Sequence, residues 1–194
     1  ALGALHVLAQ VGEAFGDFRR GDVADRVRCV DRGGAGGDRG AEHFGQVMGL
    51  GAQAQQILAT LQPLGFALKG WARSRHQIAG VDCFAGDAQL SAFLSQCDIL
   101  LCVLPLTEQT QGILDRDVFR QLPHGAALIN MGRGGHLVES DLLQALDSGQ
   151  LSGAVLDVLQ EEPAPADHPF WAHPKILLTP HIAAMTQPQT AFAV

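Results

Sequence analysis

The segment FGQVMGLGAQA, residues 44–54, decides the fold of this chain. Its apolar first half, residues 44–48, predicts a short strand, and residues 53–61 predict a helix. A tight turn that contains Gly49 and Gly51 joins the two. The order of strand, glycine turn and helix is the fingerprint of a loop that binds the pyrophosphate of a dinucleotide.

Each small residue of this loop has a physical role. Gly49 lets the chain turn sharply, Gly51 leaves room for a pyrophosphate at the backbone, and Ala54, in place of a third glycine, lets helix and strand pack closely. The N–H groups at Ala52 and Gln53, with the positive end of the helix dipole, would face the phosphates. In a second register Gly51 takes the place of the third glycine, and the phosphate site is then damaged.

The rest of the chain alternates between strand and helix patterns. Strands are predicted at residues 44–48, 67–71, 98–104, 126–131, 154–158 and 176–179, and helices at 53–61, 88–95, 115–122 and 140–148. This alternation predicts an α/β fold, a doubly wound parallel sheet of Rossmann type with helices on both faces. Ligands of such sheets bind at the carboxyl ends of the strands.

Composition excludes several classes of protein. The 194 residues are 47% hydrophobic and 17% charged, which is ample for the core of one domain. The net charge of −7 argues against a nucleic-acid surface and against binding to anionic lipid. No apolar run is long enough to span a bilayer, and no basic segment precedes the apolar residues 1–11 as in a signal peptide. We predict a cytoplasmic protein without nucleic-acid or membrane partners.

The four cysteines indicate neither a metal site nor a redox motif. They are Cys29, Cys83, Cys97 and Cys102, and their spacing matches no C-x-x-C or zinc pattern. We interpret them as reduced, partly buried thiols rather than as metal ligands or redox groups.

Residues 1–43 differ from the remainder of the chain. Residues 31–40 are rich in glycine and charge and have no periodicity, which predicts a loop or disorder. The predicted organisation is an irregular leader, 1–43, a dinucleotide-binding domain, 44–187, and a short tail, 188–194.

The end of the second predicted strand carries basic residues where an acidic one would favour NAD. Arg73 and Arg75 can pair with a 2′-phosphate, and Ser74 can add a hydrogen bond. NADP(H) is therefore favoured over NAD(H), which remains the second option. The alternative is an ordinary solvated basic turn.

Three later motifs complete the pattern: NMGRGG at 130–135, LDVLQEEPAP at 156–165 and LTPHIAA at 178–184. With the glycine loop they resemble the D-isomer-specific 2-hydroxyacid dehydrogenase family, over residues 44–187. The segments WARSR, 71–75, and LSAFLSQ, 90–96, are similar to its glyoxylate/hydroxypyruvate reductase branch.

The resemblance implies a catalytic set of Arg133, Glu162 and His181. Arg133 would bind the carboxylate of a 2-keto acid and polarise its keto oxygen. A nicotinamide cofactor would deliver hydride, and His181 would protonate the developing alkoxide. Glu162, hydrogen-bonded to His181, would orient the ring and favour its protonated form. The remaining cofactor contacts that the resemblance implies are Leu104, Pro105, Thr107, Met131, Gly132 and Asp157.

Taken singly, each catalytic candidate has an ordinary structural explanation. Arg133 could cap a helix or face solvent, Glu162 could belong to a solvated acidic loop, and His181 could be a structural histidine. Their order behind the strands of one sheet favours the functional interpretation. The other histidines that bear on the site are His136, for which the sequence identifies no partner, and His168 and His173, which we interpret as surface residues.

The family has two domains, and this sequence matches only the cofactor domain. Residues 1–43 do not resemble the family's substrate domain, and the sequence stops at Val194, so we expect a truncated chain; a shifted reading frame is one hypothesis. Two functions stay open: an NADPH-dependent reductase of glyoxylate, hydroxypyruvate or a similar 2-keto acid, and an NADP-binding module or remnant with little or no turnover. A different Rossmann dehydrogenase would not need this order of Arg, Glu and His. The resemblance also implies a homodimer.

Overall fold

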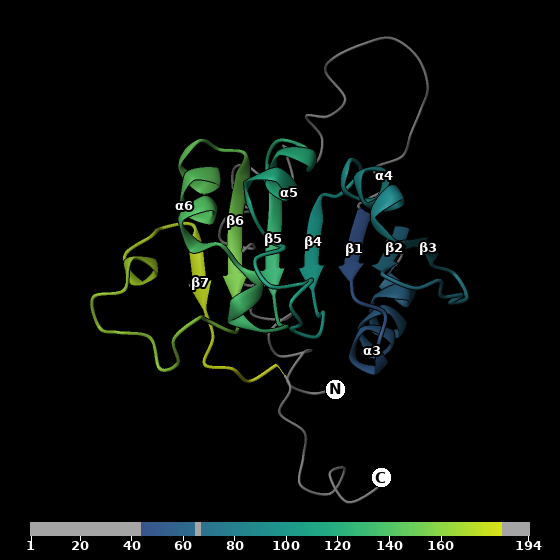
Figure 1. Ribbon diagram of the computed structural model, residues 1–194, viewed down its shortest axis with the longest axis horizontal. Helices are drawn as coiled ribbons and strands as arrows, with labels where there is room; N and C mark the ends of the chain where they lie inside the picture. The colour runs from purple at the N-terminus through teal and green to yellow at the C-terminus, as the bar shows by residue number, and fades with distance from the viewer. Residues whose placement is uncertain (1–43, 65–66, 184–194) are drawn as a thin grey trace, which may run out of the picture.

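A seven-stranded parallel sheet forms the centre of the computed structural model, which describes residues 44–64 and 67–183 (Figure 1). The strands are β1 (Phe44–Met48), β2 (Ala67–Ala72), β3 (Asp82–Ala85), β4 (Ile99–Cys102), β5 (Ala126–Asn130), β6 (Leu151–Leu156) and β7 (Ile176–Leu178). Their order is β3-β2-β1-β4-β5-β6-β7, and every neighbouring pair is parallel. The predicted doubly wound α/β fold is confirmed.

The strand order reverses at β1. The chain runs outward from β1 through β2 to β3, then returns to β4 on the other side of β1 and continues to β7. Met48, at the end of β1, pairs with Trp71 of β2 and Cys102 of β4. The three strands therefore end at one level, and the crevice beyond them is where a doubly wound sheet binds its ligand.

Helices cover both faces of the sheet. They are α3 (Ala52–Leu61), α4 (Leu90–Leu94), α5 (Arg116–Gln121) and α6 (Glu139–Asp147), with 3-10 turns at Gln62–Leu64, Asp87–Gln89, Gly134–His136 and Pro169–Trp171. Ile57 and Leu58 of α3 pack in one apolar cluster with Val47 of β1. The helices α4, α5 and α6 contribute to a second cluster, which contains Met48 and Leu128. Successive strand residues thus face different clusters, as burial on both faces requires.

The sequence-based prediction missed one edge strand and misplaced the bounds of β4 and β6. It missed β3, which pairs only with β2 and is four residues long with an exposed Asp82 at its start. Such a short edge strand has too few residues to show a periodic pattern. β6 begins at Leu151 rather than 154, and Gly153 within it interrupted the apolar signal. β4 ends at Cys102, earlier than the predicted 104.

Three of the four cysteines are described, and all three are free. Cys97 and Cys102 are buried, and burial raises the pKa of Cys102 to about 12, so this thiol stays protonated. Cys29, the predicted leader 1–43 and the predicted tail 188–194 lie outside the described residues. Within 44–64 and 67–183, no cluster of three His, Cys, Asp or Glu side chains is suited to hold a metal. None of the helices in these ranges has both the length and the apolar character to cross a membrane.

Candidate active site

The glycine turn after β1 requires glycine at position 49. Gly49 has a φ of +102°, a conformation that L side chains rarely adopt. A Cβ here would lie 2.9 Å from the carbonyl oxygen of Val103, on the segment after β4. The Gly49 N–H also donates to the Trp71 carbonyl at 2.8 Å. The turn is therefore fixed between the ends of β2 and β4.

Gly51 has a different role, because it is exposed and conformationally ordinary. It is the residue before α3, with φ −72° and ψ −173°, and a Cβ added to it would meet no atom within 4 Å. Ala54 is 1% exposed and packs against the sheet, whereas Ala52 and Gln53 lie in the first turn of α3. This geometry fits the first register of the fingerprint, with open space in front of the helix N-terminus.

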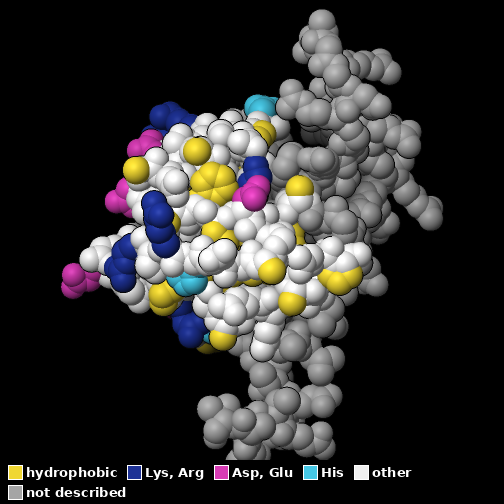
Figure 2. All heavy atoms as spheres, turned by 90° about the vertical axis from the view of Figure 1, so that its right-hand side faces the viewer, with side chains coloured by type: hydrophobic (Ala, Val, Ile, Leu, Met, Phe, Trp, Pro, Cys, Tyr) yellow, Lys and Arg dark blue, Asp and Glu magenta, His cyan; other side chains and the backbone are white. Residues whose placement is uncertain are grey.

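Arg73, Ser74 and Arg75 follow β2 and are all exposed. The Arg73 guanidinium donates to the side-chain oxygen of Gln109, in the loop after β4. Arg73 thus reaches from the end of β2 toward the loop after β4. Figure 2 shows the side of the molecule with β3: basic side chains lie in several places, with acidic side chains beside some of them. The basic character is therefore local and does not extend over this whole face.

The loop after β4 is held by its own hydrogen bonds. The Thr107 N–H donates to Oγ1 of Thr110 at 2.8 Å, and this hydroxyl donates to the Pro105 carbonyl at 2.7 Å. Leu104 is 7% exposed, whereas Pro105 and Thr107 are exposed. The loop therefore presents Pro105 and Thr107 at the carboxyl end of β4.

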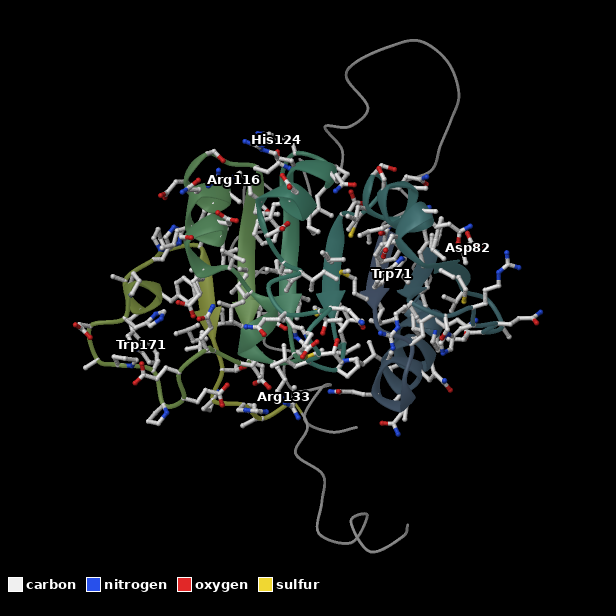
Figure 3. All side chains as sticks on the ribbon, viewed as in Figure 1. Trp71, Asp82, Arg116, His124, Arg133 and Trp171 are labelled. Atoms are coloured by element: carbon white, nitrogen blue, oxygen red, sulfur yellow. The ribbon has the colours of Figure 1, made fainter. Side chains whose placement is uncertain are left out.

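Arg133 lies on the loop after β5, at the edge of the sheet toward which the strands point (Figures 1 and 3). Its guanidinium is exposed and donates to the carbonyl of Gly132 at 2.7 Å. Met131 and Gly132, which precede it, are buried. The side chain of Asn130 holds this loop by accepting from the Gly132 N–H at 3.1 Å and donating to the Arg133 carbonyl at 3.2 Å.

Glu162 and His181 form a direct pair. Nδ1 of His181 lies 2.7 Å from Oε2 of Glu162, and Oε1 accepts from the Leu159 N–H at 2.9 Å. Partial burial raises the pKa of the Glu162 carboxyl, but the hydrogen bonds from His181 and Leu159, with the charges of His181 and Arg133, outweigh it and leave the pKa below its ordinary value. The side chains of His181 and Glu162 are 39% and 37% exposed, so the pair faces solvent.

The loop that carries His181 is built around Asp157, which is 1% exposed. Its carboxylate accepts from the N–H groups of Ile182 and Ala183 at 2.9 and 2.8 Å, and from the hydroxyl of Thr179. His181 has a φ of +52°, a conformation that needs such support. The observed contacts of Asp157 therefore position the His181 loop; a contact with a nicotinamide amide stays a prediction.

The three catalytic candidates come from neighbouring strands. Arg133 follows β5, Glu162 follows β6 and His181 follows β7, which are consecutive in the sheet. The guanidinium of Arg133 thus lies at the same end of the sheet, the carboxyl ends of the strands, as the pair of His181 and Glu162. This arrangement can bind a carboxylate and transfer a proton.

Sequence reasoning missed contacts of three histidines. His136 is 0% exposed, and its Nδ1 accepts from the Arg133 N–H at 3.0 Å. His168 and His173, interpreted as surface residues, are only 13% and 12% exposed in their side chains. Their Nε2 atoms lie 3.3 Å from Glu139 and 3.4 Å from Asp147 on α6. The surface interpretation was wrong, because both side chains are mostly buried. The sequence does not reveal this, since the carboxylate partners are 26 or more residues away.

Comparison with known proteins agrees with this geometry. The family model "D-isomer specific 2-hydroxyacid dehydrogenase, NAD binding domain" matches residues 19–183, which begins before residue 44, our predicted domain start. A D-isomer specific 2-hydroxyacid dehydrogenase family protein from Klebsiella pneumoniae 342 is 42% identical with a TM-score of 0.79, over 95% of this chain and 59% of that chain. The NADPH-dependent glyoxylate/hydroxypyruvate reductase of Sinorhizobium meliloti, solved with NADP and sulfate, is 35% identical with a TM-score of 0.75, over 88% of this chain and 55% of that chain.

A D-isomer specific 2-hydroxyacid dehydrogenase from Xanthobacter autotrophicus Py2 is 34% identical with a TM-score of 0.80, over 97% of this chain and 62% of that chain. The chain therefore spans less than two thirds of each of these three proteins. The family model covers most of the 194 residues. The chain belongs to the D-isomer specific 2-hydroxyacid dehydrogenase family, and the part of the family that it matches is the NAD-binding domain.

Proposed function

We propose that this chain is the cofactor-binding part of an NADPH-dependent reductase that converts a small 2-keto acid, of the glyoxylate or hydroxypyruvate type, to the 2-hydroxy acid. The observation that carries the proposal is the pair of Glu162 and His181, 2.7 Å apart, on the same sheet edge as Arg133. The NADPH-dependent reductase of S. meliloti, at 35% identity, supports the choice of reaction.

The residues at the crevice fit a dinucleotide with a 2′-phosphate. Gly51 leaves open space at the N-terminus of α3, whose first turn has no acidic residue. Arg73, Ser74 and Arg75 would hold the 2′-phosphate, and no carboxylate occurs among them. The nicotinamide contacts in this proposal are Leu104, Pro105, Thr107, Met131, Gly132 and Asp157. NAD(H) is the weaker option, since the acceptor for its ribose hydroxyls is missing.

The bound cofactor supplies hydride to the keto carbon. Arg133 binds the substrate carboxylate and polarises the keto oxygen, because its guanidinium is exposed and retains donors beyond the one to Gly132. His181 donates a proton from Nε2 to the developing alkoxide, since Nδ1 is engaged by Glu162. Glu162 keeps the ring oriented and balances its positive charge.

A second candidate is an NADP-binding module with little or no turnover. The observation that favours it is the exposure of His181 and Glu162, each more than one third accessible to solvent. Reductases of this kind work best when closure excludes water from the reacting atoms. We also propose that the protein is cytoplasmic and forms a homodimer. The three described cysteines are free, which supports a reducing compartment. Sedimentation velocity tests the dimer.

The experiment is a fluorescence titration of the purified chain with NADPH and NADH, followed by addition of glyoxylate or hydroxypyruvate. We expect tighter binding of NADPH, lost in the Arg73→Ala/Arg75→Ala double variant and kept in Arg116→Ala. Arg116 is the matched control, because it lies at the other end of the strands from Arg133, away from their carboxyl ends (Figure 3). Oxidation of NADPH that disappears in His181→Ala supports the reductase. Binding without oxidation supports the module, and no binding of either cofactor contradicts both.

A further inference from the structure

The ring of His136 is buried against the loop that carries Arg133. It is 0% exposed, and its Nδ1 accepts from the Arg133 N–H at 3.0 Å. In the other direction the His136 N–H donates to the Arg133 carbonyl at 3.2 Å. The two residues are therefore bonded reciprocally, around the 3-10 turn Gly134–His136.

The direction of the ring bond fixes the chemical state of His136. A backbone N–H is only a donor, so Nδ1 must be an unprotonated acceptor and the ring must carry its proton on Nε2. Burial lowers the pKa of His136, and the positive charge of Arg133 lowers it further; together they outweigh the backbone contacts with Pro105 and Arg133, which raise it. The neutral ring that the bond requires is thus the form that the surroundings favour.

The same ring also fills the space beside Gly132. A Cβ at position 132 would lie 2.9 Å from both Cε1 and Nδ1 of His136. The backbone of His136 is itself anchored, since its carbonyl accepts from the N–H of the buried Leu114 at 2.8 Å. The imidazole therefore connects the Arg133 loop to a buried and fixed part of the fold.

The side chain of Arg133 has little support of its own. It is exposed, and its guanidinium donates to the carbonyl of the adjoining Gly132. Its backbone, in contrast, is held at the N–H by His136 and at the carbonyl by His136 and Asn130. The position of the guanidinium depends on that backbone, and a displacement of 1 Å at a substrate-binding group can lower activity by about 10²-fold.

We propose that His136 is a positioning residue, which fixes the backbone of Arg133 through an acceptor at Nδ1 and so sets where the guanidinium meets the carboxylate of the keto acid. This inference deepens the proposed reductase function and rests on it for the task of Arg133. The hydrogen bond itself does not depend on that function.

The test compares His136→Leu with His136→Asn in the full 194-residue chain. The two side chains have the same branched shape, but only Asn has an acceptor, Oδ1, close to the place of Nδ1. One readout is the NMR amide signal of Arg133, with its hydrogen-exchange rate and the ring nitrogen shifts of His136 in the wild type. The other is kcat and KM for glyoxylate, with the Kd for NADPH measured alongside.

We expect the wild-type ring to carry its proton on Nε2. His136→Leu should shift the Arg133 amide, speed its exchange, and lower kcat/KM for glyoxylate by about ten- to hundredfold, with a smaller change in the Kd for NADPH. His136→Asn should restore most of both signals, which packing alone would not explain, because Asn is the smaller side chain and fills the place of the ring less well than Leu does.

Equal behaviour of the two variants in both readouts, or a proton on Nδ1 in the wild type, overturns the inference. A wild-type chain that binds NADPH but does not oxidise it contradicts the reductase proposal. If the Arg133 amide then still responds to His136→Leu and not to His136→Asn, the anchoring by His136 is supported on its own. The two failures are therefore distinguishable.

Discussion

Nδ1 of His181 lies 2.7 Å from Oε2 of Glu162, while the second oxygen of that carboxylate accepts from the Leu159 N–H. Glu162 is thus held by its own loop and in turn holds the imidazole. The carboxylate fixes the ring orientation, and in the proposed reductase this leaves Nε2 as the atom that would transfer a proton.

Glu162→Gln is expected to lower kcat for glyoxylate reduction by about 10²-fold, the lower end of what a positioned acid contributes. The amide can still hydrogen-bond to His181 but cannot balance the charge of a protonated ring. Steady-state kinetics with saturating NADPH measure the effect. The control is Glu161→Gln, an exposed neighbour whose replacement should leave kcat near wild type. Equal losses in the two variants would show that Glu162 has no special role.

Asp157→Asn is expected to lower the free energy of unfolding by about 1–3 kcal/mol. The buried carboxylate accepts two backbone N–H groups and one hydroxyl, and an amide has one oxygen fewer to offer. Because the affected loop carries His181, kcat should fall as well. Urea unfolding measures the first effect, with the exposed Asp167→Asn as the matched control. A destabilisation no larger than that of the control would rule out this role.

The central strands were predictable because their residues are buried on both faces. All five residues of β5 are buried, and β1 was predicted with its observed bounds. The edge strand β3 was not predictable, since its burial comes from one neighbour and its pattern is short. The predicted helix at 88–95 proved to be a 3-10 turn followed by α4.

The site was predictable where a residue type identifies its own chemistry. The pairing of Glu162 with His181, which the family resemblance implied, is confirmed as a contact. The contact of His136 with Arg133 could not be expected, because it depends on how the chain turns after β5. The predicted contact of Asp157 with a cofactor stays a prediction, and its support of the neighbouring loop was not foreseen from the sequence.

Gly49→Ala is expected to lower the stability of the fold, whereas Gly51→Ala is expected to weaken the binding of NADPH. At Gly49 a side chain would face a positive φ and approach the Val103 carbonyl to 2.9 Å, so the free energy of unfolding should fall by about 1–3 kcal/mol. At Gly51 a Cβ meets no protein atom, so stability should stay within about 0.5 kcal/mol of wild type. The methyl group would instead occupy the space proposed for the pyrophosphate and raise the Kd for NADPH.

Urea unfolding and NADPH titration of the same two preparations separate these effects. A Gly51→Ala variant that binds NADPH like the wild type would contradict the location of the pyrophosphate. Normal stability of Gly49→Ala would contradict the requirement for glycine in the turn.

As the pH is lowered, the free energy of unfolding of the wild type is expected to fall by more than that of His136→Asn. Burial lowers the pKa of His136 from its ordinary value of 6.5, so the unfolded chain takes up a proton before the folded chain does. The contribution of the neutral ring is therefore complete above about pH 6.5 and is lost as the pH falls to the lower, folded pKa, by about 1.4 kcal/mol for each pH unit that separates the unfolded and folded pKa values. Urea unfolding at pH 8, 6.5 and 5 measures the difference between the two proteins.

His136→Leu provides the control for this titration, because Leu and Asn both lack a group that titrates in this range. The two variants should differ in absolute stability, since only Asn can accept from the Arg133 N–H, but should change in parallel with pH. The wild type should approach them or fall below them toward pH 5. Parallel curves for all three proteins would mean that the ring of His136 takes up its proton equally in the folded and unfolded chain, and that burial does not keep it neutral.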